Sequence, residues 1–169
     1  MLLKIDIHKA FDSSRWDFIS QVMTKTGFPC IFVNWIQACI SSPKFSVLVN
    51  GSLAGYFDAS VGIRQGCPLS PYLFTMALEA LSRDIQICTE QQLIVPMPKC
   101  KALNLSLLAF ADDLMIFSKA SLASLESIML CLQHFHELLG LHINPSKSLI
   151  FFAGDSELDK APLHQRSGF

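Results

Sequence analysis

Two adjacent aspartates, Asp112 and Asp113, stand between two strongly apolar runs, Leu103–Phe110 and Leu114–Ser118. Apolar runs of this length joined by a short polar link predict two neighbouring strands. A tight turn commonly holds one aspartate, because its carboxylate can bond the backbone two residues on. Two adjacent carboxylates repel each other, and the pKa of one of them rises unless a cation lies between them. The pair therefore indicates either a solvated turn or part of a cation site.

A third acid occurs on a separate predicted strand near the start of the chain. Apolar and polar residues alternate there in the order Leu3, Lys4, Ile5, Asp6, Ile7, His8. A period of two predicts a strand with one apolar face and with Asp6 on the other face. If this strand lies beside the Asp112–Asp113 turn, the three acids converge. Magnesium prefers oxygen ligands, and two such ions about 4 Å apart can activate an attacking hydroxyl and stabilise a leaving pyrophosphate.

The remaining periodicities predict an α+β fold, an antiparallel sheet with helices packed on one face. The loose capping-box pair Ser14 and Asp17 predicts the start of the first helix. Helices are predicted over 15–26, 29–41, 71–90 and 121–139, and short strands over 141–144 and 148–153. Asn50–Gly51 predicts a type I′ turn between strands 44–49 and 52–59. Residues 154–169 are polar and without period, which predicts a flexible tail.

Composition excludes several classes of protein. Hydrophobic residues make up 51% and charged residues 16%, so the chain is not intrinsically disordered as a whole. The net charge of -1 shows no basic footprint for nucleic acid. The longest apolar stretch, 31–40, is interrupted by Asn34 and Gln37 and is too short to span a membrane. We expect a soluble, intracellular protein, nuclear or cytoplasmic.

The six cysteines form no C-x-x-C pair, and we expect free thiols in a reducing compartment rather than a disulfide scaffold. Cys131, His134 and His136 could suggest a zinc cluster. On a helix, however, residues two apart point in different directions, which disfavours a shared ion for the two histidines.

Four motifs follow one another along the chain: Lys4–Asp12, Arg64–Pro71, Phe110–Asp113 and Gly140–Ser148. In this order and spacing they resemble the palm of a reverse transcriptase from a non-LTR (LINE-type) retrotransposon, and their residues are most similar to those of plant elements. The resemblance covers roughly residues 2–153 and implies a palm-like domain there. It also implies RNA-directed DNA synthesis, with an RNA template, a DNA primer and deoxynucleoside triphosphates as partners.

The resemblance also implies roles for single residues. Asp6 and Asp112 would be the catalytic ligands shared by two Mg²⁺ ions, and Asp113 would be a third acid and metal ligand beside the primer 3′-hydroxyl. Lys147 would protonate the pyrophosphate leaving group, although a solvated turn lysine is the alternative. We read Asp12 as a local cap for the following helix.

The expected substrate-binding residues are Phe11, Arg64, Gln65 and Gly66. Phe11 matches the aromatic under the incoming sugar, which disfavours a 2′-hydroxyl; a core aromatic is the alternative. Gln65 and Gly66 match the loop whose backbone approaches the template and the nucleotide. A glycine is favoured there because it has no side chain to obstruct this approach.

Members of the resembled family carry fingers motifs before the first aspartate, and a primer grip and thumb after the palm. The sequence as given starts a few residues before Asp6. It is therefore either a polymerase fragment whose fingers and thumb belong to a longer polyprotein, or a truncated remnant without activity. An RNA-dependent RNA polymerase palm would share the paired acids, but Arg64–Pro71 and Phe11 argue against it. No motif supports a third alternative, an apolar partner-binding module.

Overall fold

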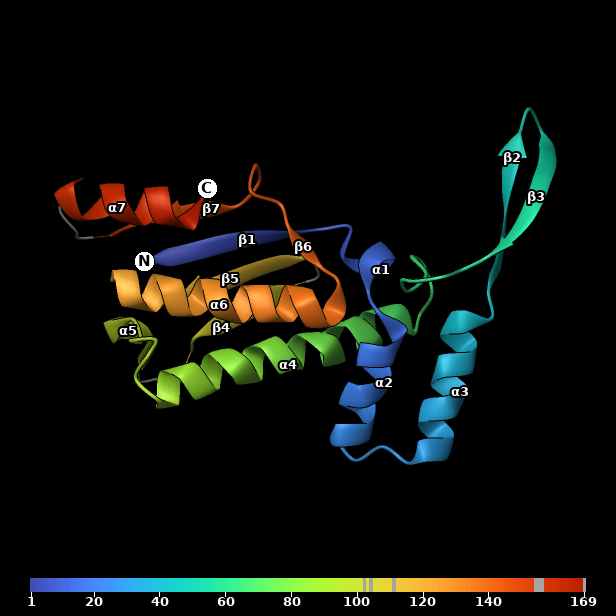
Figure 1. The fold of residues 1–169 in the computed structure, drawn as a ribbon, viewed down its shortest axis with the longest axis horizontal. Helices are drawn as coiled ribbons and strands as arrows, with labels where there is room; N and C mark the ends of the chain where they lie inside the picture. Colours follow the sequence, from blue (N-terminus) through green and yellow to red (C-terminus); the bar gives the residue numbers. More distant parts are fainter. Residues whose placement is uncertain (102, 104, 111, 154–156, 169) are drawn as a thin grey trace.

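The computed structural model describes residues 1–101, 103, 105–110, 112–153 and 157–168. Its centre is a five-stranded antiparallel sheet in the order β4-β5-β1-β6, with β7 also paired to β1. The strands are β1 (Leu2–His8), β4 (Leu107–Phe110), β5 (Asp113–Phe117), β6 (His142–Ile143) and β7 (Leu149–Phe151). Of the described residues in the apolar run Leu103–Phe110, only Leu107–Phe110 form a strand, β4, whereas the run after the aspartate pair forms β5, which lies between β4 and β1 (Figure 1).

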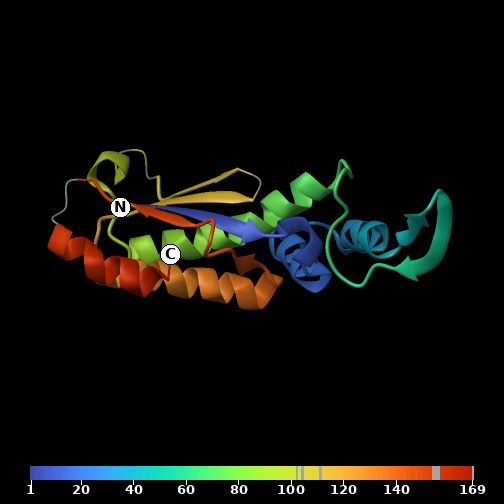
Figure 2. The ribbon, with the colours of Figure 1, turned by 90° about the horizontal axis from the view of Figure 1, so that it is seen from above.

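The long helices α4 (Ser70–Glu90) and α6 (Leu122–Leu139) lie along one face of this sheet, as the hydrophobic periodicity predicts (Figure 2). The other main helices are α2 (Trp16–Lys25) and α3 (Cys30–Ser41), and the two short ones are α1 (Ala10–Ser13) and α5 (Pro98–Lys101). The fully buried side chains of β1, Leu3 and Ile5, join Leu81 of α4 and Ile128 of α6 in one core. Burial of this apolar face is the main stabilising contribution to the fold.

The ends of α6 follow local capping rules. The Ser121 side chain accepts a hydrogen bond from the backbone N–H of Ser124, and Gly140 ends the helix with a φ of 81°. A left-handed conformation at this position is cheap for glycine because it has no Cβ. The predicted helix 121–139 is therefore confirmed.

A two-stranded hairpin, β2 (Lys44–Val49) and β3 (Ser52–Asp58), projects from one end of the molecule (Figure 1). Asn50 and Gly51 have φ values of 49° and 82°, as a type I′ turn requires. Most of its apolar side chains are exposed, including Leu48, Leu53 and Tyr56. The hairpin thus lies outside the main core.

The predicted capping box at Ser14 is wrong. The residue before α2 is Arg15, which makes no side-chain cap, and the buried Ser14 hydroxyl donates to the carbonyl of Ala10 at 2.7 Å. The short helix α1 supplies that carbonyl, so the hydroxyl is satisfied by the preceding turn instead of the following one.

The end of the chain differs from the flexible tail that its composition predicts. Residues Glu157–Ser167 form helix α7, which packs against α6. Leu163 is 4% exposed, and Arg166 Nε lies 3.2 Å from Glu126 of α6. These contacts are made with a distant segment, which is why a local period does not reveal them. None of the described helices combines the length and apolar character needed to cross a bilayer.

Candidate active site

Two of the predicted acids face each other across neighbouring strands. Asp6 of β1 and Asp113 of β5 are direct partners in the antiparallel register. Directly opposed residues in such a pair carry their side chains on the same face, with Cβ atoms about 5 Å apart. This is the face away from the buried Leu3 and Ile5, so the alternation in β1 places Asp6 where the sequence predicts.

The same face carries a cation that sequence reasoning did not single out. Lys4 Nζ lies 3.2 Å from a carboxylate oxygen of Asp113. Lys4 is two residues before Asp6, so the period of two already places both on one face. The lysine partly neutralises the charge that the two opposed carboxylates bring together.

The other edge of β1 holds the backbone of Asp6. The N–H of Asn144 donates to the Asp6 carbonyl at 2.9 Å, and the Asp6 N–H donates to the Ser148 hydroxyl at 3.2 Å. The turn between β6 and β7 is therefore attached to the strand at the acid itself. Lys147 belongs to this turn and is exposed, and its role beside the acids stays a prediction.

Asp112 lies at the turn before β5. Its carbonyl accepts a hydrogen bond from the N–H of Ile7 at 3.1 Å, and its side chain is exposed. It lines a cavity of about 530 Å³ together with Phe11, Gln65 and Gly66. The other lining residues are Lys9, Ala10, Cys67, Pro68, Ser70 and Pro71. The cavity thus combines residues of three of the four motifs.

Phe11 contacts both the core and the cavities. The ring is half-buried and stacks on Phe74 of α4 with centroids 5.1 Å apart. It also lines the cavity beside Asp112, and a second cavity of about 430 Å³ between α4 and β4. The two alternatives for Phe11, core aromatic and cleft aromatic, are therefore not exclusive.

The loop of residues 61–70 is attached to α1. The N–H of Ile63 donates to the carbonyl of Phe11 at 2.7 Å, and the Gln65 side chain donates to the Asp12 carboxylate at 3.1 Å. The reading of Asp12 as a helix cap is therefore wrong: its carboxylate binds Gln65, and the residue before α2 is Arg15. The bond between Gln65 and Asp12 joins two of the motifs and positions the loop beside the cavity.

Arg64 lies on the other side of this loop. It is exposed and lines a neighbouring cavity of about 440 Å³ with Asp12 and Gln65, not the cavity of Asp112. Its carbonyl accepts from the Ser70 hydroxyl at 2.6 Å, which joins the loop to the start of α4. Of the four expected substrate-binding residues, three therefore line one cavity and Arg64 the next.

Cys67 lines the cavity of Asp112, and sequence reasoning gave it no role. Hydrogen bonds from the backbone of Leu69, and secondarily of Ser70, hold the pKa of this thiol below its usual value. Donors directed at the sulfur stabilise the thiolate form. In the sequence, the only sign of this lowered pKa is the position of Cys67 just before the first turn of α4.

Among the described residues, no three side chains of His, Cys, Asp or Glu come together as a set that could hold a metal ion. Carboxylate oxygens are nevertheless the ligands that a hard cation prefers. The carboxylates of Asp6 and Asp113 lie opposite each other, and Asp112 is in the turn just before Asp113. Magnesium sites of this sort take few ligands from protein and the rest from water and phosphates. The gathering of all three carboxylates around metal stays a prediction.

Comparison with known proteins identifies the family. A family model described as reverse transcriptase (RNA-dependent DNA polymerase) matches residues 1–166. The chain therefore belongs to the reverse transcriptase family, whose members typically use divalent metal ions.

Two curated relatives come from transposable elements. The chain is 29% identical over 146 residues to a retrovirus-related Pol polyprotein from the type-1 retrotransposable element R2 of Popillia japonica, covering 86% of this chain and 23% of that protein. It is 27% identical over 161 residues to an uncharacterized 149 kDa protein of transposon TX1 from Xenopus laevis, covering 95% and 12%. The expected likeness to non-LTR retrotransposon enzymes is confirmed. The closeness to plant elements stays a prediction. The chain spans less than a quarter of either relative.

A solved structure supports the fold. Telomerase from Candida tropicalis, in complex with the TWJ fragment of telomeric RNA, matches 92% of this chain and 26% of its own, with a TM-score of 0.68 and 15% sequence identity. At this identity the likeness shows the fold alone, and it confirms the predicted reverse transcriptase palm-like architecture.

Proposed function

We propose that this chain is the palm of a non-LTR retrotransposon reverse transcriptase, which adds deoxynucleotides to the 3′-hydroxyl of a DNA primer along an RNA template. The observation that carries the proposal is the register of β1 and β5, which sets Asp6 opposite Asp113 in a chain whose family match runs over residues 1–166. Because the chain is a small part of its relatives, the activity belongs to a larger protein in them.

In this proposal Asp6 and Asp112 would hold two Mg²⁺ ions, and Asp113 would support the side of the primer hydroxyl. Two such ions, when bound, lower the pKa of the attacking hydroxyl and stabilise charge on the leaving pyrophosphate. The backbone bonds of Asp6 to Asn144 and Ser148 hold this acid from the edge of β1 that faces β6 and β7. The ammonium group of Lys4 partly neutralises the Asp113 carboxylate, and a divalent cation would compete with it for the same oxygens.

The cavity beside Asp112 is the proposed place of the incoming nucleotide. Phe11 would lie under its sugar, held from behind by Phe74. Gln65 and Gly66 would approach the template and the nucleotide, and Arg64 would contact substrate from the neighbouring side of the loop. Lys147 would give its proton to pyrophosphate from the turn attached to Asp6.

The proposed partners are an RNA template, a DNA primer and deoxynucleoside triphosphates, held together with fingers and thumb regions of a longer polyprotein. The family description and the RNA-bound telomerase relative support this choice. We place the protein inside the cell, in the nucleus or the cytoplasm, in keeping with its six free thiols.

Manganese binding tests the site. Mn²⁺ added to the isotopically labelled chain should broaden the amide resonances of Asp6, Asp112 and Asp113 before others, at sub-millimolar to millimolar concentration. Asp6→Asn should weaken this broadening about tenfold, because a cation site loses one of its few protein ligands. Asp58→Asn, which removes an exposed acid of the hairpin, is the matched control and should leave it unchanged. Broadening centred elsewhere, or equal in both variants, would overturn the assignment.

A second candidate is a remnant without catalysis. It keeps the fold and the acids but not the activity. Primer extension separates the two.

A further inference from the structure

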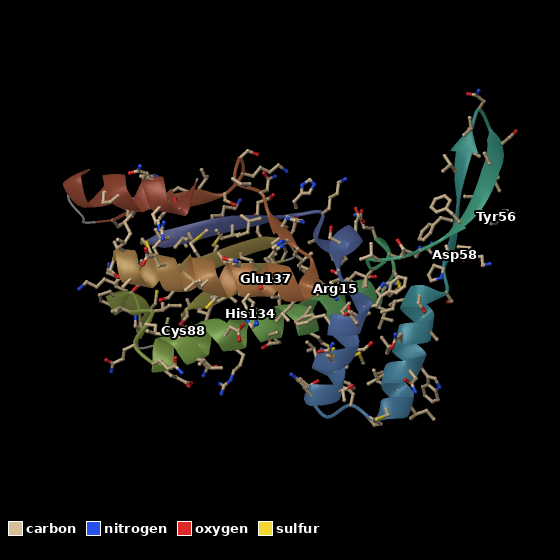
Figure 3. The ribbon with its side chains drawn as sticks, viewed as in Figure 1. Arg15, Tyr56, Asp58, Cys88, His134 and Glu137 are labelled. Carbon is tan, nitrogen blue, oxygen red and sulfur yellow. The ribbon has the colours of Figure 1, made fainter. Side chains whose placement is uncertain are left out.

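Two cysteines from different helices lie against each other at a distance from the candidate active site. Cys88 of α4 and Cys131 of α6 have their Sγ atoms 3.5 Å apart. Cys131 is buried and Cys88 half-buried. The helices pack side by side along the core, and Figure 3 labels Cys88 where α4 runs next to α6. A disulfide needs the sulfurs at about 2.05 Å, so a closure of about 1.5 Å separates this contact from a bond.

A small cavity opens onto the pair. It has a volume of about 330 Å³, and both cysteines line it. The rest of its lining is the apolar Ile87, Leu93 and Leu130 together with the polar Asp84, Ser127 and His134. A solute of a few atoms can therefore reach the sulfurs, although Cys131 is only 7% exposed.

A second cross-helix contact fixes the register of the two helices nearby. His134 of α6 donates from Nδ1 to a carboxylate oxygen of Asp84 on α4 at 3.0 Å. Asp84 and Cys88 are four residues apart on α4, and Cys131 and His134 are three apart on α6, so each pair shares one helix face. The thiols are thus held opposite each other by a neighbouring contact, and the described residues contain no three-ligand set that would make the pair part of a metal site.

We propose that Cys88 and Cys131 are a redox-sensitive pair that hydrogen peroxide converts into a disulfide between α4 and α6. The sulfur of Cys88 attacks one peroxide oxygen, an S–O bond forms, the O–O bond breaks, and the departing hydroxide takes up a proton to leave as water. The sulfur of Cys131 then attacks the Cys88 sulfur, the S–S bond forms, and the S–O bond breaks to release a second water that carries the Cys131 proton. Two thiols lose two electrons, and the peroxide is reduced to two waters.

The order of attack follows from the surroundings of the two thiols. Burial, more than any other cause, raises the pKa of Cys131 to about 12, and the nearby Cys88 and Asp84 add to this. Cys131 therefore remains a thiol at neutral pH, and the more accessible Cys88 reacts first.

The bond would join two cysteines that are 43 residues apart in sequence and so restrict the unfolded chain. It would not alter the cavity of Asp112, because the lining residues of the two cavities are different. We therefore expect a more stable protein with the acids unchanged in place.

Peroxide treatment of the whole chain tests the proposal. After alkylation of the remaining thiols and proteolysis without reductant, mass spectrometry should find the Cys88–Cys131 cross-linked peptide. The melting temperature should rise by about 5–10 °C and return with dithiothreitol. Cys88→Ser should lose both effects, whereas Cys30→Ser, at an exposed position of α3, should keep them. If peroxide modifies Cys88 in the unsubstituted chain without forming the cross-link, the proposal is wrong, and this result needs no variant to fold.

Discussion

Lys4 and Asp113 form a cross-strand ion pair in the middle of the candidate site, with side chains 36% and 43% exposed. Water screens a pair of this exposure, so its contribution to stability is small. Its position matters more, because a cation beside a carboxylate competes with a divalent metal for the same oxygens. The pair therefore connects the strand register to the metal affinity of the site.

Replacing the lysine should strengthen metal binding. We expect Lys4→Met to raise the affinity for Mn²⁺ about two- to fivefold, since an exposed pair contributes at most about 1 kcal/mol. Mn²⁺ titration followed by water-proton relaxation measures the change. Lys44→Met is the matched control, because Lys44 pairs with Asp58 at 3.7 Å on the hairpin, away from the acids. Equal affinity in the two variants would show that Asp113 is no metal ligand.

The thiol of Cys67 should be the most readily alkylated at mildly acidic pH. Its pKa lies below the usual thiol value, chiefly through the Leu69 backbone, so at mildly acidic pH a larger fraction of Cys67 than of an ordinary thiol is thiolate. At pH 6.5, iodoacetamide should modify Cys67 several-fold faster than the exposed Cys30 and Cys39. Peptide mass spectrometry at timed quenches measures the rates, and in urea the three should become similar. Faster reaction at Cys30 or Cys39 in the folded chain contradicts the assignment.

At the scale of elements, the close contact between α1 and the loop of residues 61–70 decides where the second motif lies. Gly62 has a φ of 86°, and a Cβ built on it would lie 2.5 Å from the carbonyl oxygen of Asp12. Its N–H donates to the Ser14 carbonyl at 2.9 Å. Glycine is required here for two reasons, a left-handed backbone and the approach of another backbone.

Gly62→Ala should therefore destabilise the protein more than an alanine at another left-handed glycine. Gly27 has a φ of 91° but open space where a Cβ would lie, so Gly27→Ala isolates the backbone cost of about 1 kcal/mol. We expect Gly62→Ala to cost about 2–4 kcal/mol, because two backbones must also move apart. Urea unfolding compares the two variants. Equal losses would show that the contact yields without cost.

At the scale of the whole molecule, two surface properties differ from those expected of a polymerase that works alone: the net charge and the exposure of apolar side chains. The net charge of -1 provides little attraction for a template–primer duplex, whose binding depends on phosphate contacts from Lys and Arg. The β2–β3 hairpin presents apolar side chains such as Leu48 and Tyr56 to solvent (Figure 3 labels Tyr56). Both features fit a segment that works within a larger protein.

We expect that this chain by itself does not extend a primer. Positioning and charge stabilisation supply most of the rate in this chemistry, and the chain alone has few groups that hold the duplex. A primer-extension assay with Mg²⁺ or Mn²⁺ measures this, with Asp112→Asn as control. Template-dependent extension by the native chain that is absent from the control would show that a bare palm suffices and would exclude the remnant alternative.

The sequence alone determined the elements whose periodicity is local. The alternation around Asp6, the apolar run after Asp113, the Asn50–Gly51 turn and the caps of α6 all predict their elements correctly, because each depends on neighbours within a few residues. The run before Asp112 predicts too long a strand, since β4 covers only Leu107–Phe110. Where the fold places these elements depends on burial of apolar faces between distant segments.

Only the tertiary structure decided which groups meet. The register of Asp6 against Asp113, the Lys4 ion pair, the bond of Asp12 to Gln65 and the contact of Cys88 with Cys131 join segments far apart in the chain. Helix α7, which composition predicts as a tail, depends in the same way on its contact with α6. Periodicity predicts which face of a segment is apolar. The partner of that face and the register of the pairing depend on close packing and close backbone approach between segments, so one segment alone does not determine them.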